Sequence, residues 1–187
     1  PEGGAHQSVS TPLIGMALAS MEKTPVRRLV VSDVGPEITI ESIQRIASYV
    51  GTDPRWTSFD EAMAYIRVVS APFGKLGDEQ WRHLTEHCVR QDADGGWRFR
   101  YDPKVAEPFK AAFSGEPIDL WPFYERIVCP TLVVRGAESD LLTRETWEQM
   151  GKRGPRAKLV EIPEVGHAPM FLTDEQIAVA RDFLLAP

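Results

Sequence analysis

Two stretches near the C-terminus decide the fold: Cys129-Pro-Thr-Leu-Val-Val-Arg-Gly-Ala-Glu-Ser-Asp140-Leu-Leu-Thr143 and Ala157-Lys-Leu-Val-Glu-Ile-Pro-Glu-Val-Gly-His167-Ala-Pro-Met170. Each contains a short apolar run of the kind that forms a buried strand. A loop with glycine, a titratable side chain and a helical pattern then follow. Because neighbouring parallel strands need a crossover connection, this alternation predicts a parallel α/β sheet.

A third apolar run lies nearer the N-terminus and ends in a similar way. It reads Arg28-Leu-Val-Val-Ser-Asp33-Val-Gly-Pro36, where Gly-Pro ends the predicted strand. Before it, Thr11-Pro12 predicts the start of a helix, since it offers a hydroxyl cap and a proline for the first turn. The remaining elements are predicted as strands 131–135 and 158–162 and helices 144–152 and 174–185.

The middle of the chain has a different pattern, which is helical from about residue 37 to residue 126. Turns are predicted there at 51–54, 92–96 and 115–117. We therefore expect a core formed by 1–36 and 127–187, with 37–126 as a helical insertion.

The candidate site follows from this topology. Ligands of open α/β sheets bind beyond the carboxyl ends of the strands. Asp33, Asp140 and His167 are all expected at or just after such ends, on the side from which the insertion leaves.

Composition narrows the classes of protein. The formal net charge of −6 and the sequence pI of about 5.3 give no electrostatic basis for binding nucleic acid. The longest apolar stretch, around 13–21, is too short for a membrane span and lacks the basic residues that precede a signal sequence. The two cysteines, Cys88 and Cys129, favour reduced thiols in a cytoplasmic protein. Since the chain begins at Pro1, its N-terminus is interpreted as processed, trimmed or part of a fragment.

These blocks resemble the α/β-hydrolase fold family, and within it the small esterases and C–C bond hydrolases that carry a helical cap. The matching residues are Leu29-Val-Val-Ser-Asp-Val-Gly-Pro-Glu37, the block from Cys129 to Leu142, and Val165-Gly-His-Ala-Pro169. The resemblance extends from the helix at Leu13 to the C-terminus. It implies that the chain matches the larger, C-terminal part of such a hydrolase, with 37–126 as the cap.

The resemblance also implies roles for the acid and the histidine. In the family, an acid after the penultimate strand orients a histidine that deprotonates a serine. Matching positions make Asp140 the acid and His167 the general base. Asp33 is the alternative acid, because some relatives place the acid after the earlier strand. The simpler interpretation of Asp33 is that it accepts hydrogen bonds from turn amides beside Gly35.

The nucleophile is where the chain departs from the family pattern. The segment 13–19 resembles the helix that follows the nucleophile elbow, and this alignment puts Val9 where the serine belongs. Ser8 and Ser10 are the candidates one residue away, but neither lies in G-x-S-x-G. Ser10 could equally cap the following helix.

Aromatic residues are concentrated in the predicted insertion, since 14 of the 17 lie between Tyr49 and Tyr124. Most are expected to form its core, and the remainder favour an apolar or ring-bearing acyl group as substrate. Trp81, Trp121 and Phe123 are the candidate substrate contacts.

A possible metal motif lies in the same region. His83-Leu-Thr-Glu86-His87 matches the inverted zinc-protease pattern H-x-x-E-H, but no third ligand is indicated. A cap helix is the favoured interpretation, so no metal and no cofactor are expected.

Two functions of different classes follow. The first is hydrolysis of a small apolar or aromatic ester, or of a C–C bond in an activated ketone, by a Ser-His-Asp mechanism. The alternative is an inactive, truncated hydrolase that binds a hydrophobic ligand or associates with itself. A strand over 28–34 without earlier neighbours would leave an open sheet edge, which predicts a homodimer. Neither nucleic acid nor membrane is expected as a partner.

Overall fold

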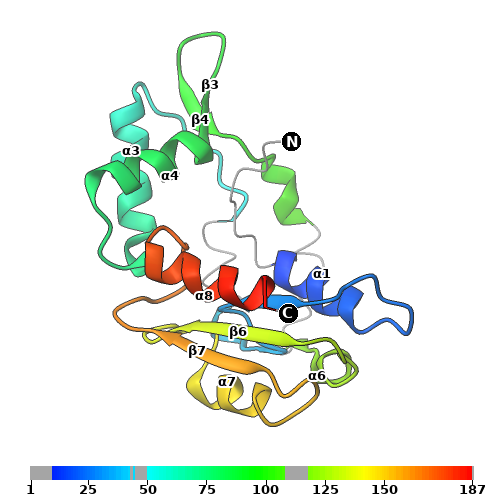
Figure 1. Ribbon diagram of the computed structural model, residues 1–187. Helices are drawn as coiled ribbons and strands as arrows, with labels where there is room; N and C mark the ends of the chain where they lie inside the picture. Colours follow the sequence, from blue (N-terminus) through cyan, green and yellow to red (C-terminus); the bar gives the residue numbers. More distant parts are fainter. Residues whose placement is uncertain (1–9, 43, 45–49, 108–117, 187) are drawn as a thin grey trace. The chain divides into compact units, whose positions relative to one another are not determined.

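The computed structural model describes residues 10–42, 44, 50–107 and 118–186 (Figure 1). As far as their residues are described, two compact units can be distinguished. The sheet unit comprises Ser8–Thr39, Pro72–Lys75 and Pro117–Pro187. The second unit, called the insertion unit below, comprises Ile40–Ala71 and Leu76–Glu116.

The sheet unit contains a three-stranded parallel sheet in the order β1-β6-β7, formed by Leu29–Ser32, Thr131–Gly136 and Lys158–Ile162. In register, Val31 pairs with Val133, and Val133 pairs with Leu159. Every residue of β6 is buried, as expected for the middle strand of a covered parallel sheet. The sequence predicted all three strands to within about two residues of their ends.

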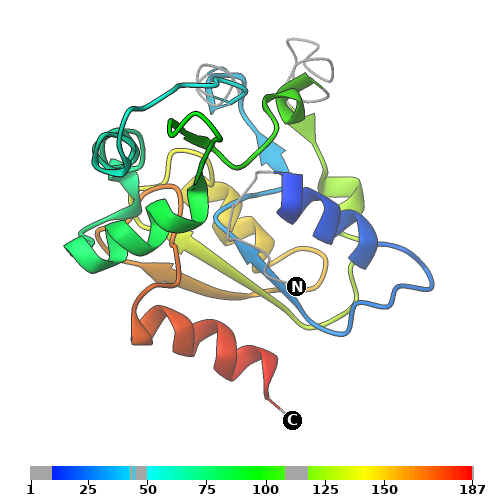
Figure 2. The same cartoon turned by 90° about the horizontal axis from the view of Figure 1, so that it is seen from above.

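Helices cover both faces of this sheet. Helix α8 (Asp174–Leu184) lies on one side, and α1 (Ser10–Ala19) and α7 (Arg144–Met150) lie on the other (Figure 2). The core on the α1 side includes Met16, Val31, Tyr124 and Met150, all almost completely buried. Tyr124 belongs to the short helix α6 (Trp121–Tyr124) and donates its hydroxyl to the Met150 carbonyl at 2.8 Å. Burial also raises the pKa of this phenol.

Side-chain caps explain where two helices begin. Thr143 caps α7 by accepting from the Thr146 amide at 3.1 Å, and Thr173 caps α8 by accepting from the Gln176 amide at 3.3 Å. Thr173 and Gln176 form only half of a capping box, because the Gln176 side chain accepts from the Phe171 amide.

The insertion unit contains the helices α3 (Phe59–Val69) and α4 (Asp78–Cys88) and a hairpin of β3 (Val89–Gln91) and β4 (Trp97–Phe99). Aromatic rings form part of its interior, since the ring centroids of Trp56 and Phe99 are 5.1 Å apart and those of Phe59 and Trp97 are 5.3 Å apart. Two 3₁₀ turns are also described, η1 (Ala71–Phe73) and η2 (Pro103–Val105).

The hairpin corrects the expectation of a helical pattern over 37–126. The turn expected at 92–96 is present, with Asp92 donating its amide to the Gly96 carbonyl at 2.8 Å, but it connects two strands.

A second pair of short strands, β2 (Glu37–Ile38) and β5 (Ile118–Asp119), belongs to the sheet unit. The residues 37–39 cluster with the sheet unit. Among the described residues, no helix has both the length and the apolar character needed to cross a membrane.

Candidate active site

His167 and Asp33 form the central pair of the candidate site, although 134 residues separate them. The imidazole Nδ1 of His167 lies 2.9 Å from Asp33 Oδ2. Because a carboxylate can only accept, Nδ1 carries the hydrogen, and in the neutral ring the lone pair is then on Nε2. The Asp33 side chain is fully buried and that of His167 is 11% exposed. A buried acid thus fixes the orientation and the tautomer of a nearly buried histidine.

Asp33 is itself held by the end of the neighbouring strand. It directly follows β1, and its amide donates to the Val134 carbonyl at 2.7 Å. Its second carboxylate oxygen, Oδ1, accepts from the Gly136 amide at 2.8 Å. Asp33 has a φ of 51°, which turns the chain sharply at the strand end. Both carboxylate oxygens therefore have a donor, and this satisfies a charge that would otherwise be costly to bury.

Gly136, the last residue of β6, allows the loop before His167 to approach closely. A Cβ atom at this position would clash with the backbone carbonyl oxygens of Val165 and Gly166. Only glycine fits such an approach. Gly136 thus donates its amide to the carboxylate of Asp33 and, having no Cβ atom, leaves room for the loop that carries His167.

The segment 72–75, called the strap below, contacts the same loop from another direction. The Gly166 amide donates to the Pro72 carbonyl at 2.7 Å. Gly74 has a φ of +94°, and a Cβ atom there would lie 3.0 Å from the Glu164 carbonyl oxygen. Lys75 forms an exposed ion pair with Glu164 at 3.2 Å. These contacts hold the backbone on the N-terminal side of His167.

Asp140, the first candidate for the acid, follows the end of β6 in the chain. It is exposed, and the hydrogen bond of His167 goes to Asp33. The structure puts the alternative acid, Asp33, at hydrogen-bond distance from the imidazole. Asp33 follows its strand directly, whereas Asp140 comes four residues after the end of β6.

The loop that carries Asp140 has a different organising residue, Arg135. Its buried guanidinium donates to three backbone carbonyls, those of Ala137, Ser139 and Leu142, at 2.8–3.2 Å. It also forms an ion pair with Glu161 at 2.6 Å. The loop after β6 is thereby folded around a charged side chain of the sheet.

The candidate nucleophiles are not placed. Ser8 lies outside the described residues, and Ser10 is the first residue of α1, with a side chain that is not described. The structure therefore shows the His167–Asp33 pair, and Ser8 and Ser10 remain the candidate nucleophiles from the sequence.

The three candidate substrate contacts differ in their surroundings. Trp121 belongs to the core of the sheet unit, is 8% exposed and packs edge-on against Tyr124. Trp81 is buried in the insertion unit, on the inner face of α4. Phe123 is 40% exposed and lines an apolar surface hollow with residues of α1. Of these three side chains, Phe123 alone is accessible to a ligand in the structure.

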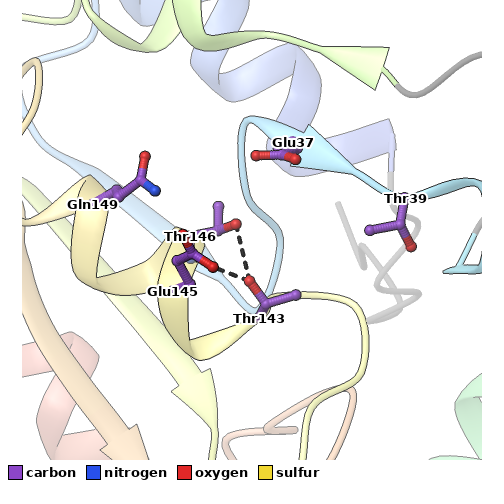
Figure 3. A pocket seen from close by; sticks show the side chains of 6 residues that line it. All are labelled: Glu37, Thr39, Thr143, Glu145, Thr146 and Gln149. Atoms are coloured by element: carbon purple, nitrogen blue, oxygen red, sulfur yellow. Dashed lines mark hydrogen bonds between the residues drawn. The ribbon is translucent and has the colours of Figure 1, made fainter.

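A hollow of about 190 Å³ lies beside the loop that follows Asp33. Figure 3 shows Glu37 and Thr39 on one side of it and residues of the α7 region on the other. Thr143 and Thr146 share a hydrogen bond of 3.0 Å between their hydroxyl groups on that second side. The lining is polar and acidic and does not include His167. This hollow is therefore separate from the imidazole of the candidate site.

From the sequence, His167 was expected at or just after a strand end, and Asp33 was the alternative acid. The roles of Gly136 and the strap were missed. The glycine after the apolar run of β6 carried a signal, since glycine at a strand end often marks close approach of backbone. Nothing in the sequence indicated that Pro72 would contact the loop before His167, because that contact depends on a tertiary arrangement.

Comparisons with known proteins bear on the family and the fold. The sequence profile described as "Alpha/beta hydrolase family" matches residues 3–181. A 3-hydroxybutyrate-oligomer hydrolase from Cupriavidus necator is 45% identical over 179 residues, covering 91% of this chain and 61% of that protein. A solved structure from Rickettsia typhi has a TM-score of 0.84 at 28% identity, covering 94% of this chain and 59% of that one. An alpha/beta hydrolase from Novosphingobium aromaticivorans has a TM-score of 0.82 at 32% identity, covering 92% and 61%. The chain thus spans about three fifths of the length of these relatives.

Proposed function

Because the chain belongs to the alpha/beta hydrolase family, we propose that it hydrolyses carboxylic esters with His167 as the general base and Asp33 as the acid that orients it. The observation that carries this proposal is the contact of 2.9 Å between His167 Nδ1 and the buried carboxylate of Asp33. It leaves Nε2 of a neutral imidazole as a proton acceptor, which is the state that a general base requires.

The proposed reaction has two halves. A serine hydroxyl attacks the ester carbonyl while His167 Nε2 takes its proton, and Asp33 stabilises the resulting imidazolium. The proton then passes to the leaving alcohol, which departs from the acyl-enzyme. In the second half, water attacks the acyl group with the same base and releases the acid. Ser8 and Ser10 are the candidates for the nucleophile.

For the substrate we propose an ester of a short hydroxy acid. Support comes from the relative named 3-hydroxybutyrate-oligomer hydrolase, at 45% identity. Oligomers of a hydroxy acid contain aliphatic ester bonds, so this proposal narrows the wider expectation of a small apolar ester. The first substrates to test are the dimer and trimer of 3-hydroxybutyrate, with p-nitrophenyl butyrate as a chromogenic ester.

The test compares the two acids in matched variants. We expect Asp33→Asn to lower kcat by roughly 10³- to 10⁴-fold, because an amide selects the wrong tautomer of the histidine. His167→Gln should lose activity to a similar extent, and Asp140→Asn should retain activity within about twofold. A large loss in Asp140→Asn together with full activity in Asp33→Asn would overturn the assignment.

The nucleophile is identified separately, by labelling with a fluorophosphonate and mapping the modified peptide. We expect a stoichiometric adduct on Ser8 or Ser10 that is absent in His167→Gln. If a folded sample forms no adduct and hydrolyses none of the three esters, the proposed activity is wrong for this chain.

A further inference from the structure

Two histidines on the outer surface of α4, His83 and His87, form a cluster that the proposed hydrolysis does not use. They lie four residues apart on one helix and are both exposed. Residues at this spacing occupy the same face of an α-helix, on adjacent turns. The sequence pattern left a cap helix as the favoured interpretation, and the arrangement of the two rings now adds a reason to expect a metal.

The rings are close and one of them is already oriented. Their centroids are 4.4 Å apart, and the ring planes are inclined by 46°. The Nδ1 atom of His87 lies 2.8 Å from the backbone carbonyl oxygen of His83. Because a carbonyl can only accept, Nδ1 carries the hydrogen, and the lone pair of the neutral ring is on Nε2. Histidines that bind metals commonly donate their second nitrogen to a carbonyl in this way, which fixes the tautomer and the ring orientation.

The helix that carries the pair is itself held firmly. Its inner face buries Trp81, Leu84 and Thr85. Thr85 donates its hydroxyl to the Trp81 carbonyl at 2.8 Å. At the N-terminus, the Gln80 side chain accepts from the Gly77 amide at 2.8 Å. The two imidazoles therefore project from a rigid element, so little ordering is needed when both bind one ion.

We propose that His83 and His87 together chelate a divalent first-row transition metal ion through one nitrogen of each ring. Imidazole ligands suit copper, nickel and zinc, with copper(II) bound most tightly, whereas magnesium and calcium require oxygen ligands. Within the described part of the chain, no group of three or more metal-ligating side chains is found. The site is therefore a two-histidine chelate whose other positions are filled by water or by an external ligand. It differs from the three-ligand site of a zinc hydrolase.

The proposal does not depend on the hydrolase activity, so metal binding is measured directly on the full chain. In titration calorimetry we expect one copper(II) or nickel(II) ion per chain and no heat of binding from magnesium. His83→Asn and His87→Asn should each weaken binding at least tenfold, and the double variant should abolish it. His6→Asn and His167→Asn are the matched controls, because they remove the other two histidines, and both should bind as the unaltered chain does.

A spectroscopic measurement places the ion. Copper(II) should broaden the imidazole proton signals of His83 and His87 in the NMR spectrum at substoichiometric metal and spare those of His167. Both altered side chains are exposed, so circular dichroism melting should show that the variants fold as the unaltered chain does. Undiminished affinity in the double variant, or broadening centred on His167 or His6, would overturn the proposal.

Discussion

The Gly166 amide donates to the Pro72 carbonyl at 2.7 Å, one residue before the histidine of the candidate site. The strap 72–75 and the loop 164–166 are 89 or more residues apart in sequence, yet they meet at this bond, at the Lys75–Glu164 ion pair and at the close approach of Gly74. Since the backbone at Gly166 determines where the His167 side chain begins, the strap contributes to the position of the proposed base.

We predict that Gly74→Ala lowers kcat/KM at least tenfold while the chain stays folded. Alanine is strained at a φ of +94°, and its Cβ would lie 3.0 Å from both the Glu164 carbonyl oxygen and Val165 Cγ2. The strap must then move away from the loop. The proton NMR signal of His167 Nδ1–H reports the effect directly, because it should shift as the bond to Asp33 changes.

Lys75→Ala is the matched control in the strap. Its ion pair with Glu164 is highly exposed on both sides, and such pairs contribute little. Activity and the Nδ1–H signal should remain as in the unaltered chain. If Gly74→Ala leaves that signal unmoved, the strap has no part in positioning the histidine.

Gly136→Ala is predicted to impair both stability and activity. The added methyl group would overlap two backbone carbonyl oxygens of the His167 loop, and backbone atoms cannot move aside as a flexible side chain can. Overpacking of this kind costs about 1–3 kcal/mol. Urea unfolding and kcat measured in parallel check the prediction, with Gly77→Ala as control, since the nearest atom there is 3.7 Å from the added Cβ. An unchanged kcat in Gly136→Ala would contradict the role of this close approach.

The strands of the sheet could be predicted from sequence because each is an apolar run bounded by residues that end strands. Lys158–Ile162 is an example, since Pro163 follows it directly. The short hairpin of Val89–Gln91 and Trp97–Phe99 could not be predicted in the same way. Three residues are too few to establish a period of two, and the preceding helix ends directly at Cys88.

The site was predictable only in part for a related reason. Sequence showed which titratable residues follow strands, and this gave Asp33, Asp140 and His167. It did not show which acid reaches the imidazole, because that depends on the length and path of each loop. Arg135 folds the loop of Asp140 through three carbonyls, and this kind of long-range polar network has no local signal.

Replacing Arg135 by methionine is predicted to destabilise the fold by about 3–5 kcal/mol, because each carbonyl left buried without a donor costs about 1–3 kcal/mol. Three backbone carbonyls and the Glu161 carboxylate would lose a buried donor. Arg144→Met is the matched control, because Arg144 also pairs with Glu161 but is 58% exposed. Equal unfolding midpoints in urea for the two variants would show that the network around Arg135 adds no stability.

Alanine variants of Trp121 and Phe123 should distinguish a side chain that packs in the core from one that contacts a ligand. Trp121→Ala removes a side chain of the core and is expected to cost about 3–5 kcal/mol of unfolding free energy. Phe123 is 40% exposed, so Phe123→Ala should change stability far less. If Phe123 contacts the ester, that variant should instead raise KM with kcat retained. A KM effect in a fully stable Trp121→Ala would contradict the assignment of Trp121 to the core.

The edge of β1 that faces away from β6 leads to a final prediction, that the chain associates with itself. Among the described strands, β1 pairs with β6 on one side only. The Leu29 amide donates to the Pro130 carbonyl and the Asp33 amide to the Val134 carbonyl, both on the β6 side. Because backbone groups alternate in direction along a strand, the amides of Val30 and Ser32 point to the opposite side of β1. Such an edge can pair with a second copy of the same strand.

We propose that this pairing makes the chain dimerise, with sedimentation velocity over a hundredfold range of concentration as the test. Val30→Lys should shift the chain toward monomer, because a charge on an edge strand opposes strand addition. Val128→Lys is the control, since Val128 is an 85% exposed valine outside the strands, and it should dimerise as before. A monomer at every concentration would refute the prediction, and equal weakening by both lysines would show that association does not use the β1 edge.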